Sequence, residues 1–169
     1  MSKIVAFLAC LCAGLAQAHS SSDAYLALDY APRGTDTVIE AQWDIALRDL
    51  HFVLAIDDDG DGAITSGEVK RHRADIEAYA YRRLAASAEG SACAVQRGRQ
   101  LVSMRADGAY AVLFFRLVCK GSPREVTLDY RLFFDVDPTH RGIVVVRNGS
   151  ATATSLVSPA NPRIGLLRR

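Results

Sequence analysis

The segment Asp57-Asp58-Asp59-Gly60-Asp61-Gly62-Ala63-Ile64-Thr65-Ser66-Gly67-Glu68 decides how this chain is organised. Carboxylates recur at alternate positions, at Asp57, Asp59 and Asp61, and another acidic side chain, Glu68, ends the segment. Gly62 follows the third of these carboxylates, and glycine permits the backbone angles of a sharp turn. This spacing directs several oxygen donors toward one point, which suits a hard divalent cation.

The spacing resembles the loop of the EF-hand family and fills each of its constrained positions. The resemblance implies that Ca2+ is held by the side chains of Asp57, Asp59, Asp61, Thr65 and Glu68 and by the main-chain carbonyl of Ala63. Ile64 would point inward as an apolar anchor. The alternative is a surface turn rich in Asp and Gly, because these residues also dominate ordinary loops.

The start of the chain has the pattern of a secretory signal peptide. Lys3 supplies a positive charge, residues 4–16 form an apolar run too short to span a bilayer, and Ala16-Gln17-Ala18 is a small-x-small cleavage site. Cleavage after Ala18 would leave residues 19–169 as one domain in the periplasm or outside the cell. A lipoprotein signal at Cys10 is the alternative, although its apolar region would be very short.

The composition argues against charged polymers as partners. The 169 residues include 20 Lys and Arg and 19 Asp and Glu, and loss of residues 1–18 removes only Lys3, which leaves 19 of each. A neutral chain without a basic stripe gives no reason to expect nucleic acid or an anionic membrane as partner. No apolar run after residue 18 is long enough for a transmembrane segment.

Two cysteines remain after the predicted cleavage, Cys93 and Cys119. In an oxidising compartment such a pair is expected to form a disulfide. Two buried free thiols are the alternative. A metal site built on this pair fits less well, because the spacing is long and no histidine lies between them.

The first half of the predicted domain combines a hairpin with two helices. Residues 24–30 and 37–43 flank a Pro-Arg-Gly turn and predict the hairpin. Trp43, Leu47, Leu50 and Leu54 then recur at helical spacing, with Asp44 as a candidate N-cap. A second helix is predicted after the loop and ends near Gly90, a candidate C-cap. Its apolar face consists of Val69, Ile76, Ala80 and Leu84.

The second half is predicted to be sheet. Residues 101–104 and 110–119 flank the turn Ala106-Asp107-Gly108, residues 126–134 form another strand, and Asn148-Gly149 joins residues 143–147 to residues 151–157. The predicted fold class is α+β: a β-sandwich-like (immunoglobulin-like) domain with an inserted helix–loop–helix EF-hand at about residues 44–88.

Three further runs resemble the exported N-terminal region of hydrogenase/urease-accessory (HupE/UreJ-like) membrane proteins. They are Ser22-Asp23-Ala24-Tyr25-Leu26, residues 43–50 (WDIALRDL) and residues 134–142 (FDVDPTHRG). In that family a soluble region precedes several membrane helices associated with nickel or cobalt uptake. Since such helices are absent here, the resemblance implies a freestanding soluble relative, and transition-metal handling becomes an alternative function.

Other possible metal ligands have simpler interpretations. Asp135 and Asp137 next to His140 are typical of a capped turn between strands. Cleavage would expose the imidazole and α-amine of His19, which can chelate copper when His51, His72 or His140 joins them, but a disordered terminus is the preferred interpretation.

The sequence therefore predicts an exported, non-enzymatic calcium-binding protein. No nucleophile elbow, zinc-protease helix or phosphate loop is present. Because only one EF-hand loop is recognisable, we expect a structural ion in a binding or interaction module, with a protein partner at the cell envelope. The alternative is a soluble accessory component that handles nickel, cobalt or copper.

Overall fold

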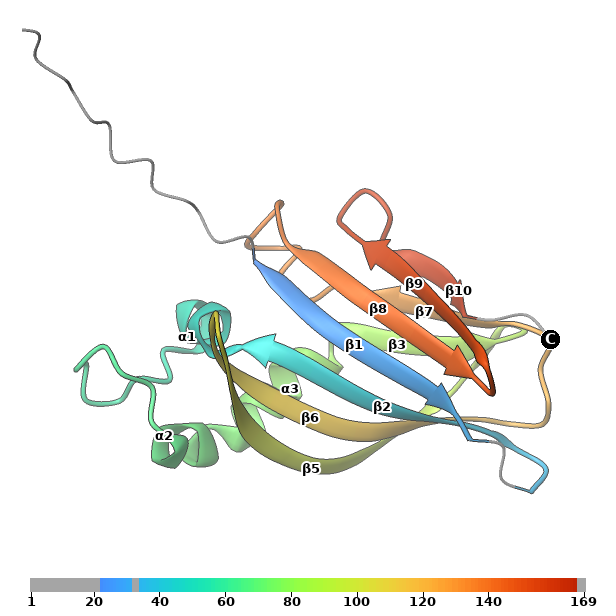
Figure 1. Cartoon of the computed structure of the whole chain (residues 1–169), viewed down its shortest axis with the longest axis horizontal. Coiled ribbons are helices and arrows are strands. Elements are labelled where there is room, and N and C mark those ends of the chain that lie inside the picture. The colour runs from blue at the N-terminus through green and yellow to red at the C-terminus, as the bar shows by residue number, and fades with distance from the viewer. Residues whose placement is uncertain (1–21, 32–33, 167–169) are drawn as a thin grey trace, which may run out of the picture.

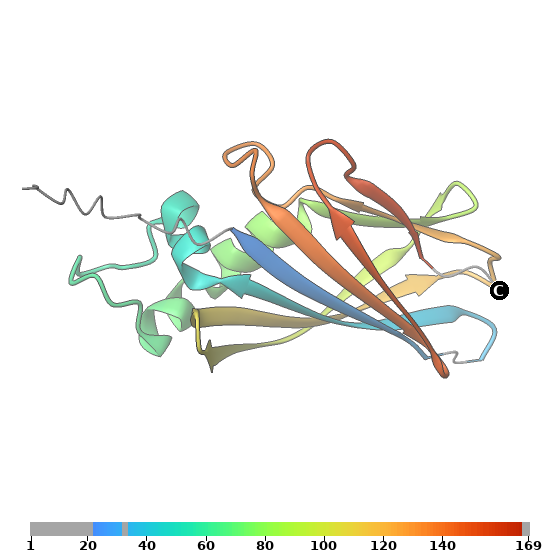
Figure 2. The ribbon, with the colours of Figure 1, turned by 45° about the horizontal axis from the view of Figure 1, so that its top comes forward.

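The computed structural model describes residues 22–31 and 34–166, so the predicted signal peptide and His19 lie outside the described residues. Within these ranges the chain forms ten strands and three short helices (Figure 1). The strands form two sheets, and the helices gather at one end of the molecule (Figures 1 and 2). The protein is thus an α+β structure composed mostly of strands.

The larger sheet has six strands. In spatial order they are β5 (Ala94–Arg105), β6 (Gly108–Cys119), β2 (Thr37–Ala46), β1 (Asp23–Tyr30), β8 (Arg141–Asn148) and β9 (Ala151–Val157). All neighbouring pairs are antiparallel except β1 and β8, which run parallel. The parallel pair places residue 22 beside the end of the β7–β8 connection, where Arg141 donates its N–H to the Ser22 carbonyl.

The smaller sheet has four strands. In spatial order they are β10 (Arg163–Leu166), β7 (Val126–Tyr130), β3 (Leu84–Ala88) and β4 (Ser91–Ala92). Each neighbouring pair in this sheet is antiparallel. The chain crosses from this sheet to the larger one at Cys93, between β4 and β5.

Three predicted hairpins are confirmed. β1 pairs with β2, β5 pairs with β6 across Ala106-Asp107, and β8 pairs with β9 across Gly149. Asn148 pairs with Ala151, so Gly149 and Ser150 are the central residues of this turn, and Gly149 adopts a left-handed conformation with φ +59°. The predicted strand over residues 126–134 is too long, because β7 ends at Tyr130 and residues 132–136 form turns.

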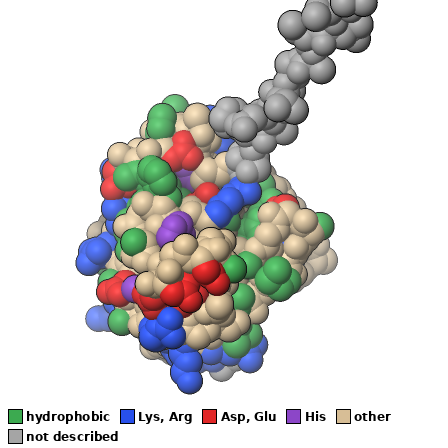
Figure 3. All heavy atoms as spheres, turned by 90° about the vertical axis from the view of Figure 1, so that its left-hand side faces the viewer, with side chains coloured by type: hydrophobic (Ala, Val, Ile, Leu, Met, Phe, Trp, Pro, Cys, Tyr) green, Lys and Arg blue, Asp and Glu red, His purple; other side chains and the backbone are tan. Residues whose placement is uncertain are grey.

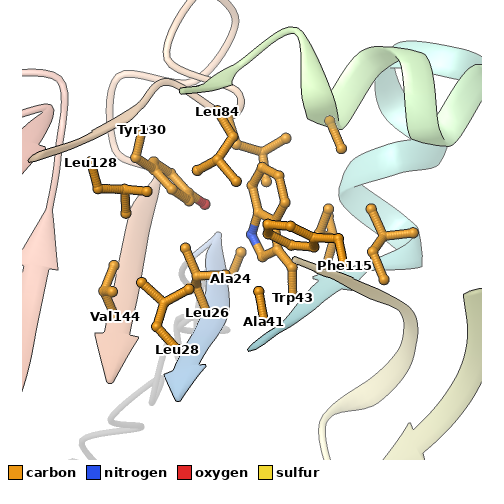
Figure 4. Packing of buried hydrophobic residues seen from close by; sticks show 14 of the residues in the cluster. Ala24, Leu26, Leu28, Ala41, Trp43, Leu84, Phe115, Leu128, Tyr130 and Val144 are labelled. Carbon is orange, nitrogen blue, oxygen red and sulfur yellow. The ribbon is translucent and has the colours of Figure 1, made fainter. Parts of the chain in front are cut away.

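One hydrophobic core takes side chains from both sheets. Trp43 of β2 is fully buried, and its ring centroid lies 5.5 Å from that of Tyr130 on β7 and 6.4 Å from that of Phe115 on β6 (Figure 4). Alternate residues of β1, Leu26 and Leu28, point into the same core, as strand geometry requires. Burial of these apolar side chains is the main force that holds the two sheets together.

The predicted helix boundaries before the loop are wrong. Trp43 and Asp44 belong to β2, and α1 (Leu47–Leu54) begins only after Ala46, which makes no side-chain cap. Asp44 instead pairs with Arg105 of β5 and accepts a hydrogen bond from Gln42. The spacing from Trp43 to Leu47 suits a helix, but the strand period of β2 also points Trp43 toward the core, so the spacing did not distinguish the two elements.

The single helix predicted after the loop is also wrong. It is divided into α2 (Ser66–Arg71) and α3 (Arg73–Tyr81), and Leu84 already belongs to β3. Gly90 lies in the turn between β3 and β4, with φ +84°, and does not end a helix. Leu84 is nevertheless buried in the hydrophobic core, since a strand can direct its side chain inward as a helix would.

The expected disulfide is present, and Cys93 and Cys119 are joined by an S–S bond of 2.03 Å. Both half-cystines are buried. Among the described residues, no helix is both long enough and apolar enough to cross a membrane.

Candidate metal centre

The end of α1 fixes the start of the acidic loop. Ala55 adopts a left-handed conformation, φ 50°, and donates its N–H to the carbonyl of His51, which ends the helix. Ile56 is fully buried, and the N–H of Asp57 donates to Nδ1 of His51 over 3.2 Å. The first loop position is therefore held by both packing and a hydrogen bond.

Three of the predicted ligands converge. Asp57, Asp59 and Asp61 offer carboxylate oxygens that all lie within 4.8 Å of one another. In residues 22–31 and 34–166 this is the only group of three or more potential metal-binding side chains at such separations. Figure 3 shows the end of the molecule that carries this loop, with acidic side chains gathered on its surface.

Backbone N–H groups within the loop orient these carboxylates. Asp57 accepts the N–H of Gly60 at 2.8 Å and that of Gly62 at 3.0 Å, and Asp61 accepts the N–H of Ala63 at 2.8 Å. Gly62 has φ +84°, so the sharp turn falls at the predicted glycine. Ile64 packs against the hydrophobic core, as expected of an apolar anchor.

Glu68 is not part of this group of carboxylates within 4.8 Å of one another. Its carboxylate is 2% exposed and accepts the N–H of Asp58 at 2.8 Å, the N–H of Thr65 at 2.7 Å and the hydroxyl of Thr65 at 2.7 Å. The hydroxyl of Thr65 in turn caps the Glu68 N–H, which completes a capping box at the start of α2. These hydrogen bonds lower the pKa of Glu68, with the Thr65 backbone N–H as the largest cause.

The donor set fits Ca2+ in part. The three aspartates and the left-handed turn have the chemistry and spacing of a hard-cation loop. The carboxylate of Glu68 would have to exchange its N–H partners for the cation, and Thr65 would have to release its capping contact. That these two residues and the Ala63 carbonyl complete the site stays a prediction.

Sequence reasoning missed the role of Asp58. Its carboxylate is 2.7 Å from the guanidinium of Arg71 and 2.7 Å from Nε2 of His72, so the second loop position is tied to the end of α2. The hydrogen bond from His72 and then that from Arg71 lower the pKa of Asp58, and the same contact raises the pKa of His72. No sequence signal relates Asp58 to residues that follow 13 and 14 positions later.

The second acidic pair forms a turn. Asp137 accepts the N–H of Thr139 at 2.8 Å and its hydroxyl at 2.6 Å, and Asp135 pairs with Arg83 at 2.6 Å. His140 is fully buried, with Ser22 Oγ 2.7 Å from Nδ1 and the Tyr130 hydroxyl 3.0 Å from Nε2. Both ring nitrogens are therefore engaged within the protein, which gives the transition-metal alternative no support at this residue.

The three runs that resemble the accessory-protein family meet at His140. Ser22, from the first run, donates its hydroxyl to Asp49 of the second run over 3.0 Å and contacts His140 of the third. When the single hydroxyl proton of Ser22 points to Asp49, Nδ1 of His140 donates to Ser22 and Nε2 accepts from Tyr130. In this tautomer the hydrogen bonds join Tyr130, His140, Ser22 and Asp49 in one network.

Burial dominates the electrostatics of this network. It lowers the pKa of His140 to about 4 and raises the pKa of Asp49. The imidazole is therefore neutral at physiological pH, so this buried ring adds no charge of its own to the core.

Comparison of the sequence with protein-family models and with curated proteins finds no match in either set.

Proposed function

We propose that this chain is an exported calcium-binding protein whose single EF-hand holds a structural ion and which acts as a binding or interaction module. The observation that carries the proposal is the convergence of Asp57, Asp59 and Asp61 within 4.8 Å on a loop that turns at Gly62. The residues that would hold the ion are these three aspartates, Ala63, Thr65 and Glu68. The ion would supply the positive charge that offsets their mutual repulsion.

A structural role is supported by how firmly the flanking helices are anchored. Leu50 on α1, Val69 on α2 and Ile76 on α3 are buried in the same core as the sheets. Opening of this helix pair would expose that apolar surface, which opposes the large rearrangement of sensor EF-hands. A dissociation constant on the order of 10⁻⁴–10⁻³ M suits such an extracellular module.

Isothermal titration and thermal unfolding of the protein with Ca2+ test the proposal. Calcium at 100 times its dissociation constant should stabilise the fold by about 2.7 kcal/mol. Asp59→Asn should abolish both the heat of binding and the stabilisation. Asp29→Asn, which removes a carboxylate 51% accessible near the end of β1, is the matched control and should leave both unchanged.

Two results would contradict the proposal. One is a titration without heat or stabilisation at millimolar Ca2+. The other is an equal response from the Asp59→Asn variant, since the loop would then not be the site. Glu68→Gln addresses the sixth ligand separately, because an amide keeps one acceptor for the capping box but supplies no second carboxylate oxygen.

We further propose that the two sheets form a β-sandwich-like (immunoglobulin-like) domain and that the chain is exported, to the periplasm or the medium. The shared core supports the first statement, and the buried disulfide supports the second, because such bonds persist in oxidising compartments. The mass of the protein recovered from the envelope fraction should correspond to a chain that begins at His19. A full-length reduced chain in the cytoplasm would contradict export.

A further inference from the structure

A second feature of the structure lies beside the EF-hand but outside the calcium loop. A cavity of about 420 Å³ opens between α1 and the β7–β8 connection. These two segments lie at the same end of the molecule (Figures 1 and 2). The residues that line the cavity, called here the α1 pocket, are Ser22, Arg48, Asp49, Phe52, Phe133, Val136 and Asp137.

The rim of the α1 pocket is apolar and accessible. Phe52 on α1 is 78% exposed and Val136 is 45% exposed, although both are large hydrophobic side chains. Neither belongs to the hydrophobic core, so the packing of this domain does not account for them. Exposed apolar side chains around a cavity are typical of a surface that binds a partner.

The interior of the α1 pocket is acidic. It holds the carboxylates of Asp49 and Asp137 and the guanidinium of Arg48, which contacts Asp49 at 3.3 Å, so the lining carries a formal charge of −1. The side chain of Asp49 is only 17% exposed. Burial raises the pKa of Asp49, and the charge of Asp137 raises it further, while Ser22 and Arg48 act in the opposite direction. An added cation would relieve this unfavourable burial.

The pocket is preformed on its inner side. The ring of Phe133 is 2% exposed, with its centroid 5.0 Å from that of His140 and 5.5 Å from that of Tyr79. Ser22 is held by its hydrogen bonds to Asp49 and His140. A wall that is ordered before binding lowers the entropy lost on association.

We propose that the α1 pocket docks a lysine side chain of a partner protein, whose neighbouring apolar residues pack on Phe52 and Val136. Lysine fits because its aliphatic stem matches the apolar rim and its compact ammonium, with three N–H donors, matches two separate carboxylates. The proposal gives the interaction module of the proposed function a surface and a class of partner. It does not depend on calcium.

The probe is a blocked peptide, acetyl-Leu-Lys-Leu-amide, titrated into the ¹⁵N-labelled protein and followed by NMR. Acetyl-Leu-norleucine-Leu-amide is the neutral control of nearly the same shape. The lysine peptide should bind at least tenfold more tightly and shift the amide signals of Ser22, Asp49 and Val136. Asp137→Asn and Phe52→Ala should each weaken binding at least fivefold, whereas Asp75→Asn, on α3, should leave it unchanged.

Several results would overturn the proposal. The first two are equal binding of the norleucine peptide and amide shifts confined to other surfaces. The third is the absence of any amide shift at millimolar peptide. The fourth is a shift of the pocket amides with protein concentration in the absence of peptide, which would indicate self-association. Phe52→Ala removes an exposed side chain, so it keeps the test valid if Asp137→Asn disturbs the turn at Thr139. Each titration is run with Ca2+ and with EGTA. Failure in both conditions rejects the lysine site, while the calcium titration independently tests the EF-hand.

Discussion

Reduction of the Cys93–Cys119 disulfide should destabilise this protein substantially. The two cysteines are 26 residues apart in the sequence. In the chain-entropy model, opening a loop of this length costs about 3.5 kcal/mol of folding stability, of which about 2.9 kcal/mol depends on loop length. For a domain of this size, that loss lowers the melting temperature by roughly 7–14 °C.

The position of the bond explains why the effect should reach the whole domain. Cys93 donates its N–H to Ala86 of β3 over 2.9 Å, and Cys119 pairs with Thr37 of β2. The disulfide therefore covalently links the point where the chain leaves the small sheet to β6 of the large sheet. Its loop also encloses the β5–β6 hairpin, and any hairpin structure retained in the reduced unfolded chain would make the effect smaller.

Urea unfolding followed by tryptophan fluorescence measures this effect, because Trp43 is the only tryptophan and is fully buried. The oxidised and reduced forms of one preparation are compared, and a Cys93→Ala/Cys119→Ala variant, which should be insensitive to reductant, is the control. A difference below about 1 kcal/mol between the oxidised and reduced forms would refute the entropic argument. Reductant-dependent unfolding of the double variant would show that the reductant acts elsewhere.

Three other predictions follow from single residues. Gly62→Ala should lower the stability of the calcium-free protein by about 1 kcal/mol. A Cβ is unfavourable at its φ of +84°, although no other atom lies within 4 Å of the added group. Thermal unfolding measures this loss, and Gly67→Ala in α2 should show none. His140, with a folded pKa of about 4 against 6.5 when unfolded, binds fewer protons in the folded state, so stability should fall by about 3 kcal/mol as pH drops from 6.5 to 4. Urea unfolding across that range should show a slope that His140→Gln removes, and an unchanged slope would contradict the assignment. Arg105→Ala should cost about 2 kcal/mol in the same assay, because it leaves the 3%-exposed Asp44 without its cation, whereas Arg105→Lys should cost less.

Local patterns were sufficient for the elements that are defined by short-range chemistry. The Asn148-Gly149 and Asp107-Gly108 turns identified two hairpins, because their backbone angles are imposed within a few residues. Helix boundaries failed where an apolar residue suits either period. Trp43 and Leu84 fit a helical pattern, yet both lie in strands, because pairing with β6 and with β7 decides their conformation.

The candidate site divides in the same way. The sequence alone located Asp57, Asp59 and Asp61 and the turn at Gly62, since alternate spacing and one glycine are local properties. The spacing Thr65-Ser66-Gly67-Glu68 is also the local signal of a capping box, which competes with the interpretation of Glu68 as a ligand. The contacts of Asp58 with Arg71 and His72 have no such signal, because they depend on where α2 begins and how it packs.

The sequence by itself determined the acidic loop, the cysteine pair and the main hairpins. Only the tertiary structure decided that Ser22, Asp49 and His140 meet, and that α1 and the β7–β8 connection enclose a pocket. Ser22 and His140 are 118 positions apart, and they are joined because β1 and β8 run parallel in one sheet. Such pairing is chosen by burial of the whole core, and no local pattern encodes it.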